Sequence, residues 1–254
     1  MRHESLDAVL DRGDAVLREL DGVRYLTYPA IDELPGIRAL TTLRQPGGSP
    51  FAAVLDRWDE RTDNLTETLR LHRTVGQWLI GACNVDQASF VSGRQIHEDR
   101  YVIVGPANAP APNELCRFDQ TDALMTALPR IALVVLTADC VPLFLADAQA
   151  RAVCCVHAGK VGTRKQIALQ VANAFFEKLG VRPQSTRALI GPSIGDGCYA
   201  PLPLWRENLE QLRAAGVETI VNPGLCTRCN PDHCYSYRAE KGFTGRMLSA
   251  IIIA

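Results

Sequence analysis

Short apolar runs dominate the middle of the chain. Between residues 88 and 159 there are six of them, rich in Val, Ile and Leu, with turn residues such as Asp, Gly and Pro between them. Runs of this length and composition are typical of buried strands in a mixed sheet. The predicted strands are ASFVS, RYVIVG, DALMT, IALVVLT, VPLFLAD and RAVCCVHAG. Earlier strands are expected in VRYLTY, residues 23–28, and GIRALTTLR, residues 36–44.

Apolar residues recur at helical spacing in other segments. This pattern predicts helices over residues 5–20, 61–82, 163–180 and 202–216, the third of which ends in a glycine stop. Residues 246–253, RMLSAIII, fit a helix or a strand. Because strands and helices alternate with no linker or repeat between them, we expect one α/β domain.

Composition narrows the class of protein. The chain has 254 residues, 47% of them hydrophobic, and a formal net charge of −1, so neither nucleic acid nor an anionic membrane is an expected partner. The N-terminal stretch is charged throughout, and no apolar run approaches the roughly 20 residues that span a bilayer. The nine cysteines form no regular framework, which favours reduced thiols and a cytoplasmic location. No protein partner is indicated.

Candidate chemistry is concentrated where predicted strands end. Cys140 follows the strand IALVVL, and His157 ends the strand RAVCCVH, directly before the glycine turn AGKVG. The pair could be two buried residues, two metal ligands, or a nucleophile and its base. His97 lies in a polar turn between two further strands. Two His and one Cys suit Zn²⁺ and leave a fourth position open for water or substrate, as in catalytic zinc sites.

Other polar and cysteine residues have simpler interpretations. Asp139 could orient a ligand or cap a strand end, and for Asp122 the structural role is favoured. Cys154 and Cys155 are adjacent in a strand, so their side chains should enter the core on opposite faces.

The segment CTRCNPDHC presents a possible zinc knuckle. Its potential ligands are Cys226, Cys229, His233 and Cys234. A knuckle needs two separated ligand pairs that close a tetrahedron, and the adjacent His233 and Cys234 fit this requirement poorly.

Seven blocks of the chain resemble, in order, those of the YfiH-like purine nucleoside phosphorylase family, long labelled multicopper polyphenol oxidoreductase or laccase. The blocks are SGRQIH, TDALMT, LTADCVPLFLAD, VHAGKVGT, IGPSIGDGCY, CTRCNP and SYRAEKGFTGRMLSAI. The resemblance runs from about Arg38 to the C-terminus. It implies an α/β fold with a mixed β-sheet sandwich flanked by helices, similar to the cytotoxic necrotizing factors. We therefore expect an N-terminal helical extension over residues 1–22 and the family's domain over residues 23–254.

The same resemblance implies a site and an activity. The ligands of a zinc ion would be His97, Cys140 and His157. The reaction would be phosphorolysis of adenosine, inosine, guanosine or methylthioadenosine, with adenosine deamination as a further activity. Substrates would thus be purine nucleosides and phosphate. Arg44, in the block TTLRQPGG, would contact phosphate beside a glycine turn.

The chain departs from the family in the glycine turn after His157. The family's HAGWRG reads HAGKVG here, so Lys160 and Val161 replace a tryptophan and an arginine. Lys160 or Arg164, at the start of the next helix, could supply the lost positive charge, although lysine lacks the planar fork of arginine. Ala200 replaces the family's usual glutamate. Further on, residues 237, 238 and 246 (Tyr, Arg and Arg) fall in family blocks and could shape the fold or the anion region.

Three other functions remain open at this point. A cysteine hydrolase would use Cys140 as nucleophile and His157 as base, and would not need His97. A multicopper oxidase is poorly supported, because the five histidines include no His-X-His pair. The altered HAGKVG turn is also compatible with a non-catalytic protein that binds zinc and nucleoside.

Overall fold

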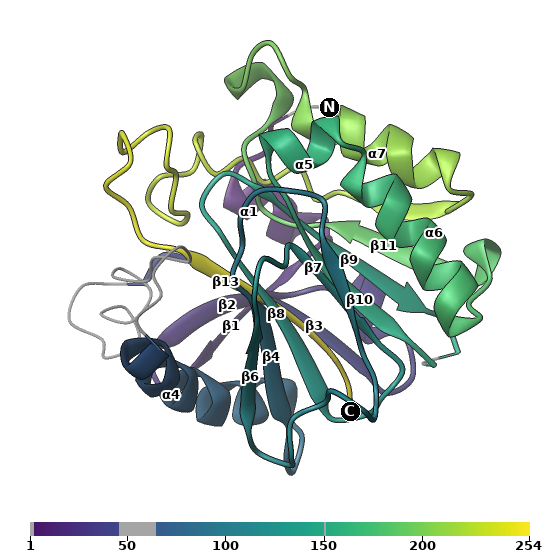
Figure 1. The fold of residues 1–254 in the computed structure, drawn as a ribbon. Coiled ribbons are helices and arrows are strands. Elements are labelled where there is room, and N and C mark those ends of the chain that lie inside the picture. The colour runs from purple at the N-terminus through teal and green to yellow at the C-terminus, as the bar shows by residue number, and fades with distance from the viewer. Residues whose placement is uncertain (1–2, 46–64, 150) are drawn as a thin grey trace.

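Two mixed β-sheets stack face to face between layers of helices (Figure 1). The computed structural model describes residues 3–45, 65–149 and 151–254. A cluster of buried side chains from both sheets fills the space between them, so the sheets share one core. The expected single-domain α/β sandwich is confirmed.

The first sheet has seven strands in the order β1-β2-β3-β13-β8-β4-β6. Here β4 runs parallel to β6 and β8, and the other neighbours pair antiparallel. Its strands are β1 (Val16–Leu20), β2 (Val23–Thr27), β3 (Ile37–Thr42), β4 (Ser89–Gly93), β6 (Leu115–Phe118), β8 (Ile131–Thr137) and β13 (Met247–Ile253). The ambiguous C-terminal segment is therefore a strand, and it lies near the centre of the sheet.

The second sheet has six strands in the order β12-β11-β9-β10-β7-β5. The pairs β5·β7 and β11·β12 are parallel, and the others are antiparallel. Its strands are β5 (Tyr101–Val104), β7 (Ala123–Thr126), β9 (Val141–Asp147), β10 (Val153–Ala158), β11 (Thr186–Ile190) and β12 (Thr219–Val221).

Helices cover the outer faces of both sheets. Side chains of α4 pack in one cluster with the first sheet, and those of α6 and α7 pack in another with the second. The α-helices are α1 (Leu6–Asp11), α2 (Pro29–Asp32), α4 (Leu65–Cys83), α5 (Lys160–Arg164), α6 (Ile167–Leu179) and α7 (Leu204–Ala214), and the 3-10 turns are η1 (Pro183–Ser185) and η2 (Asp196–Cys198). Within the described ranges, none of the helices has the length and apolar character needed to cross a membrane.

Two of the predicted helices differ from the structure: one ends early, and the other is interrupted. The N-terminal helix ends at Asp11, because Gly13 takes a left-handed backbone (φ 75°) and the chain then enters β1. The expectation of helix over residues 12–20 is therefore wrong, whereas the domain boundary at residue 22 stays a prediction. The helix expected from residue 163 is interrupted at Gln166 (φ 61°), which separates α5 from α6.

The adjacent cysteines of β10 enter different cores, as the alternation of a strand predicts. Cys155 is fully buried between the two sheets, and Cys154 is fully buried among residues that α6 covers. Burial raises the pKa of both thiols, so neither is a thiolate at neutral pH.

Asp147 closes β9 with a buried carboxylate. Its Oδ1 accepts a hydrogen bond from the Ser185 hydroxyl at 2.9 Å, and its Oδ2 accepts one from Arg151 Nε at 2.7 Å. Burial favours the neutral acid, but the bonds from Arg151 and Ser185 outweigh it and lower the pKa of Asp147.

We expect Asp147→Asn to lower the free energy of unfolding at pH 7 by about 2 kcal/mol, the scale of a hydrogen bond to a charged group. Because the folded pKa lies below the unfolded value of about 4, the stabilisation is complete above that pH and is lost as pH falls through the folded pKa. Urea unfolding of wild type and variant at pH 7 and at about pH 2.5 measures both effects. The exposed Glu218→Gln is the control. An undiminished difference between wild type and Asp147→Asn at low pH would contradict the assignment.

Candidate functional site

The three side chains that the sequence proposes as ligands lie together. The Sγ of Cys140 and a ring nitrogen of each of His97 and His157 are all within 4.8 Å of one another. The two imidazole rings are nearly perpendicular, at 87°, with centroids 4.7 Å apart. Cys140 lies in the turn from β8 to β9, where the chain crosses from one sheet to the other. His157 is in β10, and His97 is in the connection from β4 to β5.

Asp122 fixes both histidines. Its carboxylate accepts backbone hydrogen bonds from Ile96, His97 and Glu98 at 3.3, 2.9 and 3.0 Å. It also accepts the Nδ1 hydrogen of His157 at 2.8 Å. These hydrogen bonds hold His97 at a left-handed φ of 63° and occupy Nδ1 of His157, so Nε2 is the ring nitrogen of His157 left for a ligand. The sequence favours a structural role for Asp122. It does not reveal these partners, which lie 24 to 35 residues away in the chain.

The glycines of HAGKVG are steric requirements of the site. A Cβ at Gly159 would lie 3.1 Å from His97 Cδ2 and 3.2 Å from Cys140 Sγ. A Cβ at Gly162 would lie 2.6 Å from the backbone oxygen of Glu98, closer than such contacts occur. A side chain at Gly162 is therefore excluded, and one at Gly159 would crowd the His97 and Cys140 side chains.

Cys140 and His157 polarise each other. Burial alone would raise the pKa of the Cys140 thiol, but His157 and His97 lower it to about 6. Burial alone would lower the pKa of His157, but the charge of Cys140 and the hydrogen bond to Asp122 raise it. The pair therefore favours thiolate and imidazolium, and a thiolate is the form of cysteine that binds metals or attacks carbon.

Asp139 ties the turn that carries Cys140 to the C-terminal loops. It has a left-handed φ of 85°, a rare conformation for a residue other than glycine. Its carboxylate accepts the Thr227 hydroxyl at 2.6 Å and the Arg238 backbone N–H at 2.7 Å. Its backbone oxygen accepts the Ile194 N–H at 3.0 Å. These contacts hold the walls of the site rather than the histidine rings.

The Cys140, His97 and His157 side chains line a cavity of about 390 Å³. In the cavity wall the guanidinium of Arg238 stacks on the Tyr199 ring at 4.5 Å. The other lining residues are Leu136, Ala138, Asp139, Lys160, Ile194, Leu204, Tyr237, Lys241 and Arg246. Four cations thus line the cavity beside apolar and aromatic surface, a combination that suits an anion bound next to a flat ring.

Lys160 is among the cavity-lining residues, as the first residue of α5. Arg44, by contrast, is not among the described residues that line it. The Arg44 guanidinium pairs with Glu240 at 2.6 Å, bonds the Cys234 carbonyl at 3.2 Å and stacks on Tyr235 at 4.5 Å. The glycine turn after Arg44 lies outside the described residues. The predicted contact between Arg44 and phosphate stays a prediction.

Some cavity residues escaped the sequence analysis. Tyr199 and Lys241 lie in blocks where nothing singled them out, and Arg164, considered as an alternative cation, is exposed and outside the cavity lining. The Arg and Lys residues of SYRAEKGFTGRM were the available signal. Their convergence depends on loop contacts over about 100 residues of chain, such as that of Arg238 with Asp139.

The double sheet, with a Cys–His–His group in a cavity lined by cations, defines a class of α/β sandwich proteins with a candidate metal site. Within that class the chain belongs to the YfiH family, described as "Multi-copper polyphenol oxidoreductase laccase", whose sequence model matches residues 39–201 and 200–254. This confirms the family predicted from the sequence blocks.

Relatives share both sequence and fold with this chain. The purine nucleoside phosphorylase YlmD of Bacillus subtilis is 30% identical over 207 residues, covering 69% of this chain and 74% of the relative. A purine nucleoside phosphorylase of Bacteroides thetaiotaomicron is 26% identical and covers 91% of this chain and 96% of the relative. The solved structure of the Bacillus licheniformis hypothetical protein YfiH superposes with a TM-score of 0.74, at 26% identity, over 94% of this chain and 99% of that chain.

Proposed function

We propose that the protein is a zinc-dependent purine nucleoside phosphorylase. The observation that carries the proposal is the meeting of His97, Cys140 and His157 under a cavity lined by four cations. The names of the relatives support the choice of substrate class. A cavity of about 390 Å³ also falls in the range of about 300–1,000 Å³ of small-molecule sites.

The donor set fits zinc. Two imidazole nitrogens and one thiolate are typical ligands of a catalytic Zn²⁺ site that keeps one position open. Copper chemistry of the multicopper type is less compatible, because the five histidines include no His-X-His pair. Bound between His97, Cys140 and His157, zinc would supply a Lewis acid for a substrate oxygen.

The cavity residues account for the needs of phosphorolysis. In this reaction a phosphate oxygen forms a bond to ribose C1′, the bond from C1′ to the purine nitrogen breaks, and the purine leaves with the electron pair and takes up a proton. Lys160, Lys241 and Arg246 would bind and orient the phosphate. The Tyr199 ring and the side chains of Ile194 and Leu204 would flank the base.

Asp139 and Arg44 would act as positioning residues. Asp139 holds Arg238 and the Thr227 loop around the cavity. Arg44, through Glu240, holds the loop from Ser236 to Thr244, since the Glu240 carboxylate also accepts hydrogen bonds from both of those residues. The contact of Arg44 with phosphate stays a prediction from the sequence, because Arg44 is not among the described residues that line the cavity.

A cysteine hydrolase is the second candidate, favoured by one observation. The Cys140 thiol has a lowered pKa beside His157, which in turn bonds Asp122, so the three could act as nucleophile, base and orienting group. His97 distinguishes the candidates. A metal site needs this residue as a ligand, whereas a Cys–His–Asp triad does not.

The isolated protein is expected to release hypoxanthine from inosine only when inorganic phosphate is present, with equal formation of ribose 1-phosphate. Chromatography of the products with and without phosphate measures this, and metal analysis of the same sample measures zinc. Adenosine tests the further proposed activity, since deamination forms inosine without phosphate.

Release of free ribose in the absence of phosphate would show that the reaction is hydrolysis and not phosphorolysis. A zinc-loaded protein that binds nucleoside without turnover would establish the non-catalytic alternative.

All nine cysteines are free, which supports our further proposal of a reducing, cytoplasmic location.

A further inference from the structure

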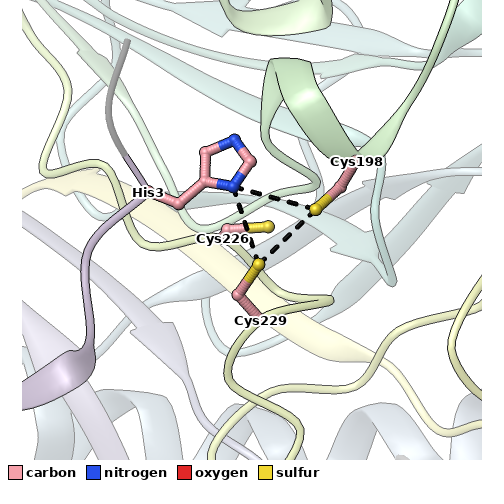
Figure 2. A group of neighbouring side chains, drawn as sticks. All are labelled: His3, Cys198, Cys226 and Cys229. Atoms are coloured by element: carbon pink, nitrogen blue, oxygen red, sulfur yellow. Dashed lines mark hydrogen bonds between the residues drawn. The ribbon is translucent and has the colours of Figure 1, made fainter.

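A second group of potential metal ligands lies outside the cavity lining. The ring of His3 and the thiols of Cys198, Cys226 and Cys229 place one nitrogen and three sulfurs within 4.8 Å of one another (Figure 2). They come from the N-terminal segment, from η2 and from the loop between β12 and β13. His233 and Cys234, which the sequence offered as partners of Cys226 and Cys229, are not members of this group.

The separations match the edges of a tetrahedral zinc site. His3 Nδ1 lies 3.7 Å from Cys198 Sγ and 3.6 Å from Cys229 Sγ, and the two sulfurs are 3.4 Å apart. With Zn–S of about 2.3 Å and Zn–N of about 2.0–2.1 Å, a tetrahedron has edges of about 3.6 Å from nitrogen to sulfur and about 3.8 Å between sulfurs. The atoms of His3, Cys198 and Cys229 therefore need only small shifts to surround an ion, and Cys226 Sγ lies within 4.8 Å of each of them.

A disulfide explains the cluster less well. The 3.4 Å between Cys198 Sγ and Cys229 Sγ exceeds the bonded distance of about 2.05 Å, and all three cysteines are free. A disulfide would also use two sulfurs and leave the third thiol and His3 without a reason to converge. A metal uses all four groups.

Hydrogen bonds hold the backbone around the cluster in place. The Gly195 N–H donates to Cys226 Sγ at 3.2 Å, a hydrogen bond that stabilises a thiolate. The buried Asn230 accepts the Leu6 N–H and donates to the carbonyls of Glu4 and Cys226 at 3.0 and 2.9 Å. One side chain thus joins the N-terminal segment to the Cys-X-X-Cys turn.

The His3 ring is held in place by close packing. It meets the Trp205 ring edge-on with centroids 5.5 Å apart, and a Cβ at Gly195 would lie 2.3 Å from its Nε2. This packing turns Nδ1 toward the sulfurs (Figure 2). Coordination through Nδ1 leaves the ring hydrogen on Nε2, so the long 3.4 Å contact from the Gly197 N–H would be lost.

We propose that His3, Cys198, Cys226 and Cys229 bind one Zn²⁺ in a closed, structural site. Four protein ligands complete the tetrahedron and leave no position for substrate, in contrast to the three-ligand group under the cavity. The ion would fasten the N-terminal segment and η2 to the loop before β13. The residues that carry this proposal are not those that carry the proposed catalytic function.

The second site borders the walls of the cavity. Cys198 directly precedes Tyr199, and Thr227, between the two loop cysteines, donates to Asp139. Loss of the ion is therefore expected to weaken nucleoside binding through Tyr199 and Asp139. The residues of the first metal group would all remain in place.

Metal analysis of the full chain tests the proposal. Cys229→Ser is expected to contain one zinc fewer per chain than wild type, and the same loss is expected in a Cys140→Ala background, where the first site is removed. Cys116→Ser, a change at a half-buried cysteine outside both groups, is the matched control and should keep the wild-type zinc content. Because the readout is zinc content, failure of the catalytic proposal does not affect it.

Cobalt substitution gives a second measurement. Thiolate-to-Co²⁺ absorption should fall further in Cys229→Ser than in Cys140→Ala, since three thiolates belong to the second site and one to the first. His3→Ala keeps every cysteine and is expected to bind the second ion more weakly while remaining folded. Unchanged zinc content in both His3→Ala and Cys229→Ser would overturn the proposal. So would a native protein in which mass analysis finds a Cys198–Cys229 disulfide.

Discussion

Replacing Cys140 with alanine is expected to lower phosphate-dependent base release by more than about 100-fold and to remove one zinc per chain. The thiolate is the only sulfur donor of the first group, and losing a Lewis acid costs several kcal/mol of transition-state stabilisation. Cys140 is one of the lining residues, and its substitution leaves the cations and the aromatic side chains of the cavity in place. Nucleoside binding should therefore persist while turnover is lost.

His97→Ala supplies the decisive comparison. A metallo-phosphorylase should lose zinc and activity in both variants, whereas a Cys140–His157 hydrolase should tolerate loss of His97. Cys116→Ala serves as a control for thiol substitution, because Cys116 is half-buried and belongs to neither ligand group. Wild-type activity in Cys140→Ala would exclude both candidates, and activity lost only in Cys140→Ala would favour the hydrolase.

Asp122→Asn should weaken zinc binding at the first site by about 10–100-fold, the range found for carboxylates that hold metal-bound histidines. The carboxylate accepts the His157 Nδ1 hydrogen and three successive backbone N–H groups around His97. An amide keeps the shape but has no charge, and its NH₂ group must face a donor. Both histidines should then lose their fixed orientation.

Competition with a zinc-binding dye measures the affinity, and activity at saturating zinc measures rescue. We expect excess zinc to restore part of the activity of Asp122→Asn, since the ligands themselves remain. Asp119→Asn is the matched control, because it lies on the same turn and pairs with Arg94 at the surface. Equal zinc affinity in wild type and Asp122→Asn would show that the contact is dispensable.

Much of the fold could be predicted from local pattern, because buried strands and amphipathic helices have distinct apolar spacing. The failures have local causes too. The N-terminal apolar residues fit one long helix until Gly13 and the pairing of β1 with β2 are known. The short strand β6 is half-buried along its length, and β12 has three residues, so neither has a strong apolar pattern. The order of strands depends on pairings that no single segment contains.

The candidate site could also be predicted only in part from the sequence. Cys140, His157 and His97 could be grouped because each follows or joins predicted strands. Asp122 and Arg44 could not be assigned their partners, since His157 lies 35 residues from Asp122 and Glu240 lies 196 residues from Arg44. The second ligand group shows the same limit. Cys226 and Cys229 were visible as a motif, but their partners come from the first residues of the chain and from η2.

The central position of β13 has a consequence for synthesis on the ribosome. Residues 247–253 fill the gap between β3 and β8, pairing antiparallel with both. The chain leaves the ribosome with its N-terminal end first. Before β13 has emerged, β8 can therefore pair with β4 but has no neighbour on its other edge. An exposed strand edge of this kind is a hazard for aggregation. We expect the nascent protein to need protection by chaperones until β13 has left the ribosome. Only then can the first sheet be completed.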